Sequence, residues 1–380
     1  MTHGIASRSA LAQIPSFGPD PSEIREIVEP TQPIAWAYVR LDIEGEDARA
    51  LQLRHIAETL EPTGVSPEAV ATLRQRLTSD VVAPLTLATF VRADGTLLHE
   101  RRLSELVVDD RMGYSAPAEV LPLLIHDQVR PPYVFVVVDR SGADLMYSAG
   151  GQQTEQHEVV VGPDDEIERN SPGGWSQSRY QRRAEDSWQH NARYVAERVE
   201  ARVAQVGAQV LVLSGDVRAV QLLRASLDDE PSMVVEQVRG SRSADGSQSH
   251  RGDILAEALR DAADVQTQRL LEVFRENLAP GGLAIQGVAA TLHALAAGRV
   301  ATLLISAQDA DREAWFGEAA TEIYLDHSTA MLGQEPVRLS SVIPAAVRSA
   351  LLAGARVRVL TPQEAEQLES GIGALCRFAE

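Results

Sequence analysis

Residues 171–183 have the sequence Ser171-Pro-Gly-Gly-Trp-Ser-Gln-Ser-Arg-Tyr-Gln-Arg-Arg183, a glycine turn that leads into a basic helix. The paired Gly173 and Gly174 allow backbone conformations that other residues avoid, and they permit close approach to a ligand. Ser176 is a good N-cap for the helix that follows. The amide groups at a helix start attract phosphate, and so do basic side chains on the first turns. Those side chains are Arg179, Arg182 and Arg183. We therefore predict that this turn contacts nucleic acid.

The helix that follows the turn is predicted to be long and amphipathic. Its apolar residues step by three and four positions as far as Val206, the spacing of a helix with one buried face. Around it, the strands predicted at 133–138, 143–148, 157–161, 209–213 and 234–238 form a mixed sheet, with a further helix at 217–227. The segment 240–249 is rich in glycine and serine, which predicts a loop, and a second long helix is expected from Ile254 to Leu278.

The sequence on either side predicts two more α/β regions. After a mobile leader that ends at Pro33, a strand is expected at 34–41, helices at 46–60 and 67–77, and a hairpin of 85–91 with 96–100 through the turn Arg92-Ala-Asp-Gly95. The last hundred residues predict helices at 288–297 and 342–353, and strands at 300–305, 357–360 and 375–378. We predict three domains, over residues 1–132, 133–279 and 280–380.

Composition limits the kinds of function that are possible. The chain has 380 residues and a net charge of -19, which disfavours a protein that coats nucleic acid through its overall field, so any such contact must be local. The basic residues are all arginine, a good bidentate partner for phosphate. No apolar run approaches the roughly 20 residues of a membrane-spanning helix, and the start lacks a signal-peptide pattern. We expect a cytoplasmic protein that needs no cofactor, with Cys376 as a packed thiol.

Two further segments carry a family resemblance. Residues 282–305, Gly282-Leu-Ala-Ile-Gln-Gly-Val-Ala-Ala-Thr-Leu-His-Ala-Leu-Ala-Ala-Gly-Arg-Val-Ala-Thr-Leu-Leu-Ile305, resemble the opening of the C-terminal domain of archaeal and eukaryotic class-one release factors and of Pelota. Gly371-Ile-Gly-Ala-Leu-Cys-Arg-Phe378 is similar to the closing strand of that domain. The turn at Gly173 then falls where release factors carry their Gly-Gly-Gln loop. Its Gly-Gly-Trp-Ser-Gln string resembles an actinobacterial branch of Balon-like ribosome hibernation factors.

The resemblance implies a fold, a partner and a site. It implies an α/β protein with a ribonuclease-H-like middle domain and an L7Ae-like α/β/α C-terminal domain. The implied partner is the bacterial ribosome, bound at its aminoacyl-tRNA site with the middle domain directed at the peptidyl-transferase centre. A translational GTPase such as elongation factor Tu is a possible further partner. The RNA-binding residues would be Gly173, Gly174, Trp175, Ser176, Gln177, Arg179, Arg182 and Arg183.

One departure from the family decides between two functions. Trp175 stands where catalytic release factors carry the glutamine that helps to place a water against the ester of peptidyl-tRNA. An indole cannot present that polar group, but it can stack on a base for about 1–3 kcal/mol. We therefore expect a factor that occupies the ribosome in hibernation or rescue without hydrolysis. The alternative is a peptidyl-tRNA hydrolase that uses Gln177 through a remodelled loop.

Other kinds of site have simpler explanations in this sequence. Asp139, Asp144 and Asp216 lie near predicted strand ends, where a two-metal nuclease would gather carboxylates, but each also has the position of a turn-forming aspartate. The nine histidines include no pair at metal-ligand spacing with supporting residues. A phosphate loop of P-loop GTPases needs a lysine, and this chain has none. A solvated helix face remains the plain alternative for the three arginines.

Overall fold

The computed structural model describes residues 17–18, 20–41, 45–77, 86–103, 109–150, 155–162, 177–227, 234–237, 248–279, 281–307, 312–326 and 337–379. Of these, residues 177–187, 234–237 and 248–250 are described by their backbone alone. The chain forms two compact units. The first holds Asp20–His126 and Arg269–Glu380, and the second holds Asp127–Gln268 with residues 17 and 18. The three predicted domain ranges stay a prediction, because this division does not test them. The mixed α/β fold is confirmed.

The N-terminal part of the first unit is an antiparallel sheet with helices on both faces. Its strands are β1 (Ile34–Arg40), β2 (Thr86–Val91), β3 (Leu97–Leu103) and β4 (Arg111–Ser115), in the order β3-β2-β1-β4. The helices α3 (Glu46–Leu60) and α4 (Pro67–Leu77) cover one face, because alternate residues of β1 pack with Ile56, Leu60 and Leu73. Both helices have the predicted bounds, and the predicted hairpin is confirmed with small shifts at its ends.

A helix lies before Pro33, where the sequence predicted a mobile leader. Ser22–Val28 form helix α2, in which Ile24, Ile27 and Val28 are buried. These side chains share one core with helix α5 (Leu121–Gln128), helix α11 (Val342–Leu352) and the outer face of β1. Prolines on both sides of α2 give its sequence a loop-like composition. Part of its core comes from α11, more than 300 residues later in the chain, which no local pattern shows.

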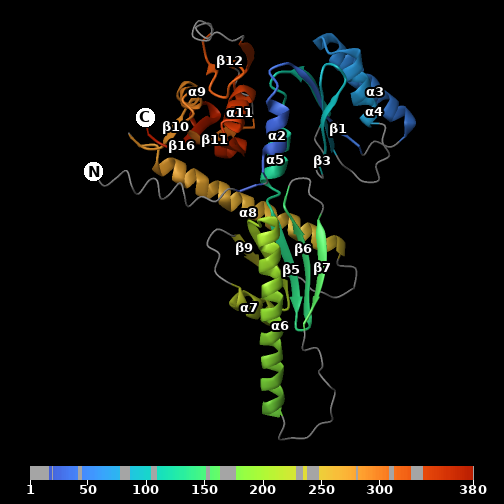
Figure 1. Ribbon diagram of the computed structural model, residues 1–380, viewed down its shortest axis with the longest axis vertical. Coiled ribbons are helices and arrows are strands. Elements are labelled where there is room, and N and C mark those ends of the chain that lie inside the picture. Colours follow the sequence, from blue (N-terminus) through green and yellow to red (C-terminus); the bar gives the residue numbers. More distant parts are fainter. Residues whose placement is uncertain are drawn as a thin grey trace. The chain divides into compact units, whose positions relative to one another are not determined.

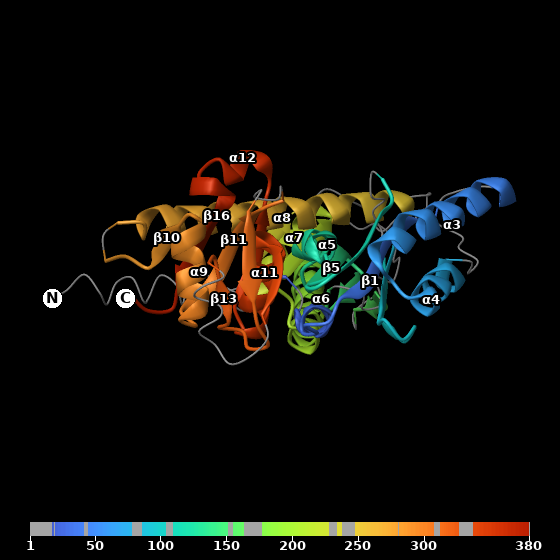
Figure 2. The same ribbon diagram turned by 90° about the horizontal axis from the view of Figure 1, so that it is seen from above.

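The C-terminal part of the first unit is an α/β/α sandwich, as predicted. Its sheet has the order β10-β16-β11-β15, formed by Ala284–Gln286, Ile372–Cys376, Val300–Ser306 and Arg356–Leu360. Leu303 and Ile305 pack on the side of α9 (Val288–Ala296) and α11, while Leu304 packs on the side of α12 (Pro362–Ala365) and the end of α8 (Gln248–Glu276). Figure 2 shows α9 and α12 on opposite sides of β11 and β16. Cys376 is buried in the sheet.

Some C-terminal elements differ from the predictions. The closing strand β16 runs from Ile372 to Cys376 rather than from Leu375 to Phe378. A small sheet of β12 (Glu313–Phe316), β13 (Ile323–Tyr324) and β14 (Arg338–Ser341) was not predicted. Helix α8 begins at Gln248, so the last two residues of the predicted loop 240–249 are helical, and residues 240–247 lie outside the described part. Within the described residues, no helix is long and apolar enough to cross a membrane.

The second unit is a mixed five-stranded sheet between helices. The order β7-β6-β5-β8-β9 joins Gln156–Val161, Gly142–Ser148, Tyr133–Asp139, Val210–Gly215 and Val234–Gln237. β5, β6 and β7 pair antiparallel, whereas β8 runs parallel to β5 and to β9. One face packs on α6 (Gln177–Val206) and α7 (Val217–Ser226), and the other packs on α8. This is the predicted mixed sheet with its long helix (Figure 1).

Candidate functional site

The predicted RNA-binding loop connects two described elements of the second unit. Strand β7 ends at Val161, and helix α6 begins at Gln177. Residues 163–176 lie between them and outside the described residues, and they include Gly173, Gly174, Trp175 and Ser176. The structure therefore fixes where this loop leaves and rejoins the domain, while its predicted contacts stay a prediction.

Helix α6 is a projecting arm whose base is held by Asn191. Figure 1 shows α6 running past the ends of β5, β6 and β7 within the second unit. Asn191 is 3% exposed, and its Nδ2 donates a hydrogen bond to the carbonyl oxygen of Arg140 at 3.1 Å. Fourteen residues separate Gln177 from Asn191, so at a rise of 1.5 Å per residue the helix runs for about 21 Å between them. The start of α6 is thus carried at a distance from Asn191.

The other end of the loop is anchored against the same asparagine. Gly162 follows β7, and its amide donates a hydrogen bond to the carbonyl oxygen of Ser141 at 2.8 Å. A β-carbon on Gly162 would lie 2.4 Å from Cγ of Asn191, far inside normal contact distance. Only glycine fits between this strand end and α6. The start of the loop and the base of the arm are therefore packed together.

Gln177, Arg179, Arg182 and Arg183 all lie in the first two turns of α6. The three arginines are separated by three and four positions, which places them along one side of a helix. Continuing that spacing leads to Arg193 and Glu197, both exposed, whereas Val195 and Val199 face the sheet. The arginine positions thus lie on the side of α6 opposite its buried seam. The conformations of the arginine side chains are not described.

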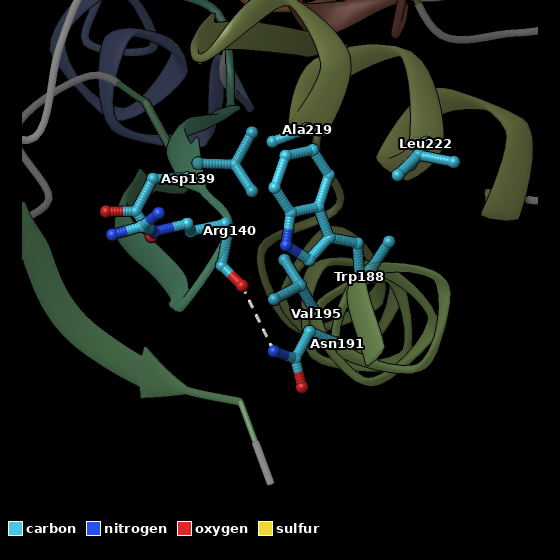
Figure 3. Close-up of a pocket in the computed structure, with 9 residues that line it drawn as sticks. Asp139, Arg140, Trp188, Asn191, Val195, Ala219 and Leu222 are labelled. Atoms are coloured by element: carbon cyan, nitrogen blue, oxygen red, sulfur yellow. Dashed lines mark hydrogen bonds between the residues drawn. The ribbon is translucent and has the colours of Figure 1, made fainter. Parts of the chain in front are cut away.

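A small pocket marks the contact between the arm and α7. Figure 3 shows the indole of Trp188 pointing from α6 toward Ala219 and Leu222 of α7, with Asn191 bonded to the Arg140 carbonyl below it. The guanidinium of Arg218 lies over the Trp188 ring, 5.7 Å from its centroid. Such a contact is worth about 0.5–1 kcal/mol at a partly exposed site. The pocket is small and its polar groups hold the arm, so we assign it a structural role.

Farther along α6, an ion pair fixes the helix on the sheet. Arg202 Nε contacts Glu158 Oε2 of β7 at 2.6 Å, and both side chains are about one-quarter exposed. The hydrogen bond to Glu158 raises the pKa of Arg202, which burial partly opposes. The Arg202 guanidinium also lies 5.4 Å from the centroid of the Tyr147 ring in β6. Together with buried Val195 and Val199, these contacts make the C-terminal half of α6 a rigid support.

The three aspartates considered for metal binding have structural partners. Oδ1 of Asp139 accepts hydrogen bonds from the amides of Ser141 and Gly142, as expected for a turn residue. Asp216 is the N-cap of α7, where its side chain accepts from the amides of Arg218 and Ala219. Asp144 faces Arg251 at 3.5 Å. Among the residues that the structure describes, no three histidine, cysteine or acidic side chains are grouped to hold a metal.

Comparison with known proteins identifies the second unit. Residues 132–280 match the family model of bacterial archaeo-eukaryotic release factor family 2. The matched range runs from the start of β5 to the end of α8 and contains the loop at Gly173. Through this region, which is less than half of the chain, the protein is similar to that release-factor family. We call the matched range, residues 132–280, the release-factor domain.

Relatives over a longer range are more distant. The uncharacterized protein Rv2629 of Mycobacterium tuberculosis strain H37Rv is 26% identical over 263 residues, which cover 68% of this chain and 69% of that protein. Among solved structures, ribosome-bound archaeal Pelota is 12% identical with a TM-score of 0.41, covering 95% of this chain and 94% of the other. Saccharomyces cerevisiae Dom34, a translation termination-like factor, is 8% identical with a TM-score of 0.40, covering 95% and 92%. The assignment rests on the release-factor domain.

The support of the loop escaped the sequence analysis. Asn191 and Gly162 are polar or small residues with no motif around them, and their partners come from a turn some 50 and 20 residues earlier. A partial signal exists in Asn191, which interrupts the apolar seam of α6 at a position that faces the sheet. Trp188 lines a pocket with Ala219 and Leu222, and its contact with Arg218 depends on how α7 packs.

Proposed function

We propose that this chain is a ribosome-associated translation factor that binds the aminoacyl-tRNA site and places the Gly173-Gly174-Trp175 loop near the peptidyl-transferase centre. The observation that carries the proposal is the family match of residues 132–280, because the glycine loop lies inside the matched range. The projecting half of α6 supports it further, since a loop on a helical arm can reach a recessed RNA surface. The contacts of Asn191 and Arg202 fix the direction in which α6 leaves the sheet.

The proposed action is occupation without hydrolysis. Trp175 would stack on an exposed base or ribose, a contact worth about 1–3 kcal/mol. Arg179, Arg182 and Arg183, on the outward side of α6, would pair with phosphates of ribosomal RNA. Such local contacts are compatible with a net charge of -19 because the arm keeps them away from the bulk of the chain. We infer a role in hibernation or rescue of ribosomes from the resemblance of the Gly-Gly-Trp-Ser-Gln string to Balon-like factors.

A peptidyl-tRNA hydrolase is the second candidate. Gln177 is the first residue of α6, so its amide group is close in sequence to the two glycines. A rearranged loop could bring that amide to a water beside the ester bond. Peptide release from stalled ribosomes by the native chain, lost in Gln177→Ala, would establish this candidate. Absence of release by the native chain, with ribosome binding intact, supports occupation.

Cosedimentation with bacterial ribosomes tests the proposal directly. We expect the native chain to sediment with vacant ribosomes and Trp175→Ala to bind about 5- to 150-fold more weakly, the equivalent of one lost stacking contact. Elongation factor Tu with a GTP analogue is added in a second series, because delivery by a translational GTPase is part of the proposal. Failure of the native chain to sediment with ribosomes in either series would contradict the proposed function.

A further inference from the structure

Helix α8 packs on one side of the five-stranded sheet of the second unit. Leu255, Leu259 and Ala262 of α8 pack against β5 and β8, through Phe135 and Val212 among others. On the same side of the sheet, Val159 and Val161 of β7 remain 67% and 61% exposed. These valines pair with Asp144 and Gly142 of β6, so they lie on the outer strand of the sheet. Nearer the other end of the same strands, a groove is lined by Met146 of β6, His157 of β7 and Leu255 of α8 among others.

The groove has the size and lining of a small-molecule site. Its volume is about 550 Å³, within the range of roughly 300–1,000 Å³ that is usual for such sites. Met146, Leu255 and Leu259 give it an apolar floor. At one end the hydroxyl of Tyr133 donates to Oε2 of Glu155, and Nε2 of His157 lies 3.1 Å from Oε1 of the same carboxylate. The Glu155 carboxylate is thus occupied by two donors of the protein.

Arg130 supplies a positive charge at this end of the groove. Its Nε is buried and has no hydrogen-bond partner among the described residues. Burial of Tyr133 and its bond to Glu155 raise the pKa of the phenol, whereas the charge of Arg130, which lines the same groove, lowers it. The second arginine of the lining, Arg251, faces Asp144 at 3.5 Å. Arg130 is therefore a cation at this end of the groove, with a buried nitrogen that no described residue satisfies.

Gly252 keeps the wall of the groove open. It lies in α8, where glycine is less favourable than alanine and where its backbone has ordinary helical geometry. A β-carbon built on Gly252 would meet no atom of the described residues within 4 Å, so their packing does not require glycine at this position. The residue lines the groove directly. A side chain here would project into open space beside Leu255, which is the space that a bound molecule would use.

We propose that this groove binds a small organic oxyanion, with a phosphate or carboxylate at Arg130 and an apolar or ring-shaped body over Met146, Leu255 and Leu259. The planar guanidinium of arginine suits both kinds of oxyanion because it can donate two parallel hydrogen bonds. The site lies on the face of the release-factor domain opposite the arm, and it is independent of the proposed ribosomal function. It would allow a metabolite to bind the domain while α6 remains available.

The test uses the full-length protein and isothermal titration with three probes: adenosine 5′-monophosphate, benzoate and uncharged adenosine. We expect saturable binding of the monophosphate, of benzoate or of both, and at least tenfold weaker binding of adenosine. Binding of the monophosphate alone would identify a phosphate ester as the ligand, binding of benzoate alone a carboxylate, and binding of both a general oxyanion site. Absence of binding by both charged probes, or equal binding of adenosine, would overturn the proposal.

Two variants separate the site from a general surface effect. Arg130→Gln should weaken binding of the charged probes at least tenfold. Gly252→Leu should abolish it while the melting temperature stays unchanged or rises, because the substitution fills the groove and removes a helical glycine. Arg224→Gln, at an exposed arginine of α7 in the same unit, serves as the matched control and should bind like the native chain. Unchanged binding in Gly252→Leu would contradict the proposed location.

Discussion

The guanidinium of Arg348 in α11 donates a hydrogen bond from Nε to the carbonyl oxygen of Val28 at the end of α2, at 3.0 Å. The other nitrogens of the same group donate to the carbonyl oxygens of Glu29, Gly317 and Glu318 at 2.9–3.0 Å. Arg348 is 2% exposed, and burial lowers its pKa, which nearby carboxylates partly oppose. This one side chain thus ties the N-terminal helix to the C-terminal sandwich within the first unit.

Arg348→Leu should destabilise the first unit by on the order of 3 kcal/mol, because it leaves buried carbonyl oxygens of two segments without donors. Arg348→Lys should recover part of this loss, since a single ammonium group cannot reach four acceptors. Urea unfolding followed by circular dichroism measures both changes. Arg224→Ala, at an exposed site in α7, is the matched control and should change stability by less than about 0.5 kcal/mol. A similarly small effect of Arg348→Leu would show that α2 is held by its apolar side chains alone.

Gly162→Ala should destabilise the release-factor domain by about 1–3 kcal/mol, because the new methyl group would overlap the side chain of Asn191. The variant Asn191→Ala should lose roughly 1 kcal/mol through its hydrogen bond to Arg140. Combined, the two substitutions should cost less than their sum, since the smaller side chain makes room for the methyl group. Thermal unfolding of the four proteins gives the coupling. Strict additivity would mean that Gly162 and Asn191 do not contact each other.

Arg182→Ala together with Arg183→Ala should weaken ribosome binding and reduce its dependence on salt. If each arginine pairs with one phosphate, the slope of log affinity against log salt concentration should fall by about 1.5. Cosedimentation at several salt concentrations measures this slope, with Arg224→Ala as the comparison. A weaker but equally salt-dependent interaction would indicate that the two arginines support the loop without touching RNA.

Stability should decline at alkaline pH because of Tyr133. Burial and Glu155 raise the pKa of Tyr133 in the folded chain above its unfolded value of about 10. Its contribution is therefore complete below pH 10 and is lost as the pH rises beyond that value, by about 1.4 kcal/mol per pH unit. The free energy of unfolding of Tyr133→Phe should fall less steeply between pH 10 and 11. Equal slopes for the two proteins would show that the phenol titrates normally.

Long elements with a clear period were predictable from sequence. Helices α3 and α4 have the predicted bounds because Gly45 and Pro67 mark their starts and their apolar residues recur at helical spacing. The seam of α6 was equally clear, although the residues that hold the helix at its base were not. Short elements were missed for a physical reason. β13 has two residues, too few for an alternating pattern, and it forms because β12 lies beside it.

Contacts between residues far apart in the sequence were the second reason that parts of the structure could not be predicted. Helix α2 is stabilised by Arg348 and by the core of the first unit. Its own proline-flanked sequence does not show these contacts, and it was therefore predicted as a mobile leader. The glycine loop itself was found from Gly173 and Gly174, but the asparagine that holds its arm has no sequence signature. The groove beside α8 was not predicted either, because it depends on how far the helix covers the sheet. The sequence thus predicts the loop, which stays a prediction, and packing shows the contacts that hold its flanking elements.

An electron-microscopy map of this protein mixed with bacterial ribosomes tests the central claim most directly. We predict density for the release-factor domain in the aminoacyl-tRNA site, with α6 directed at the peptidyl-transferase centre and the residues around Trp175 against ribosomal RNA. Binding elsewhere on the ribosome, or binding in that site with α6 pointing away from the peptidyl-transferase centre, would contradict the account.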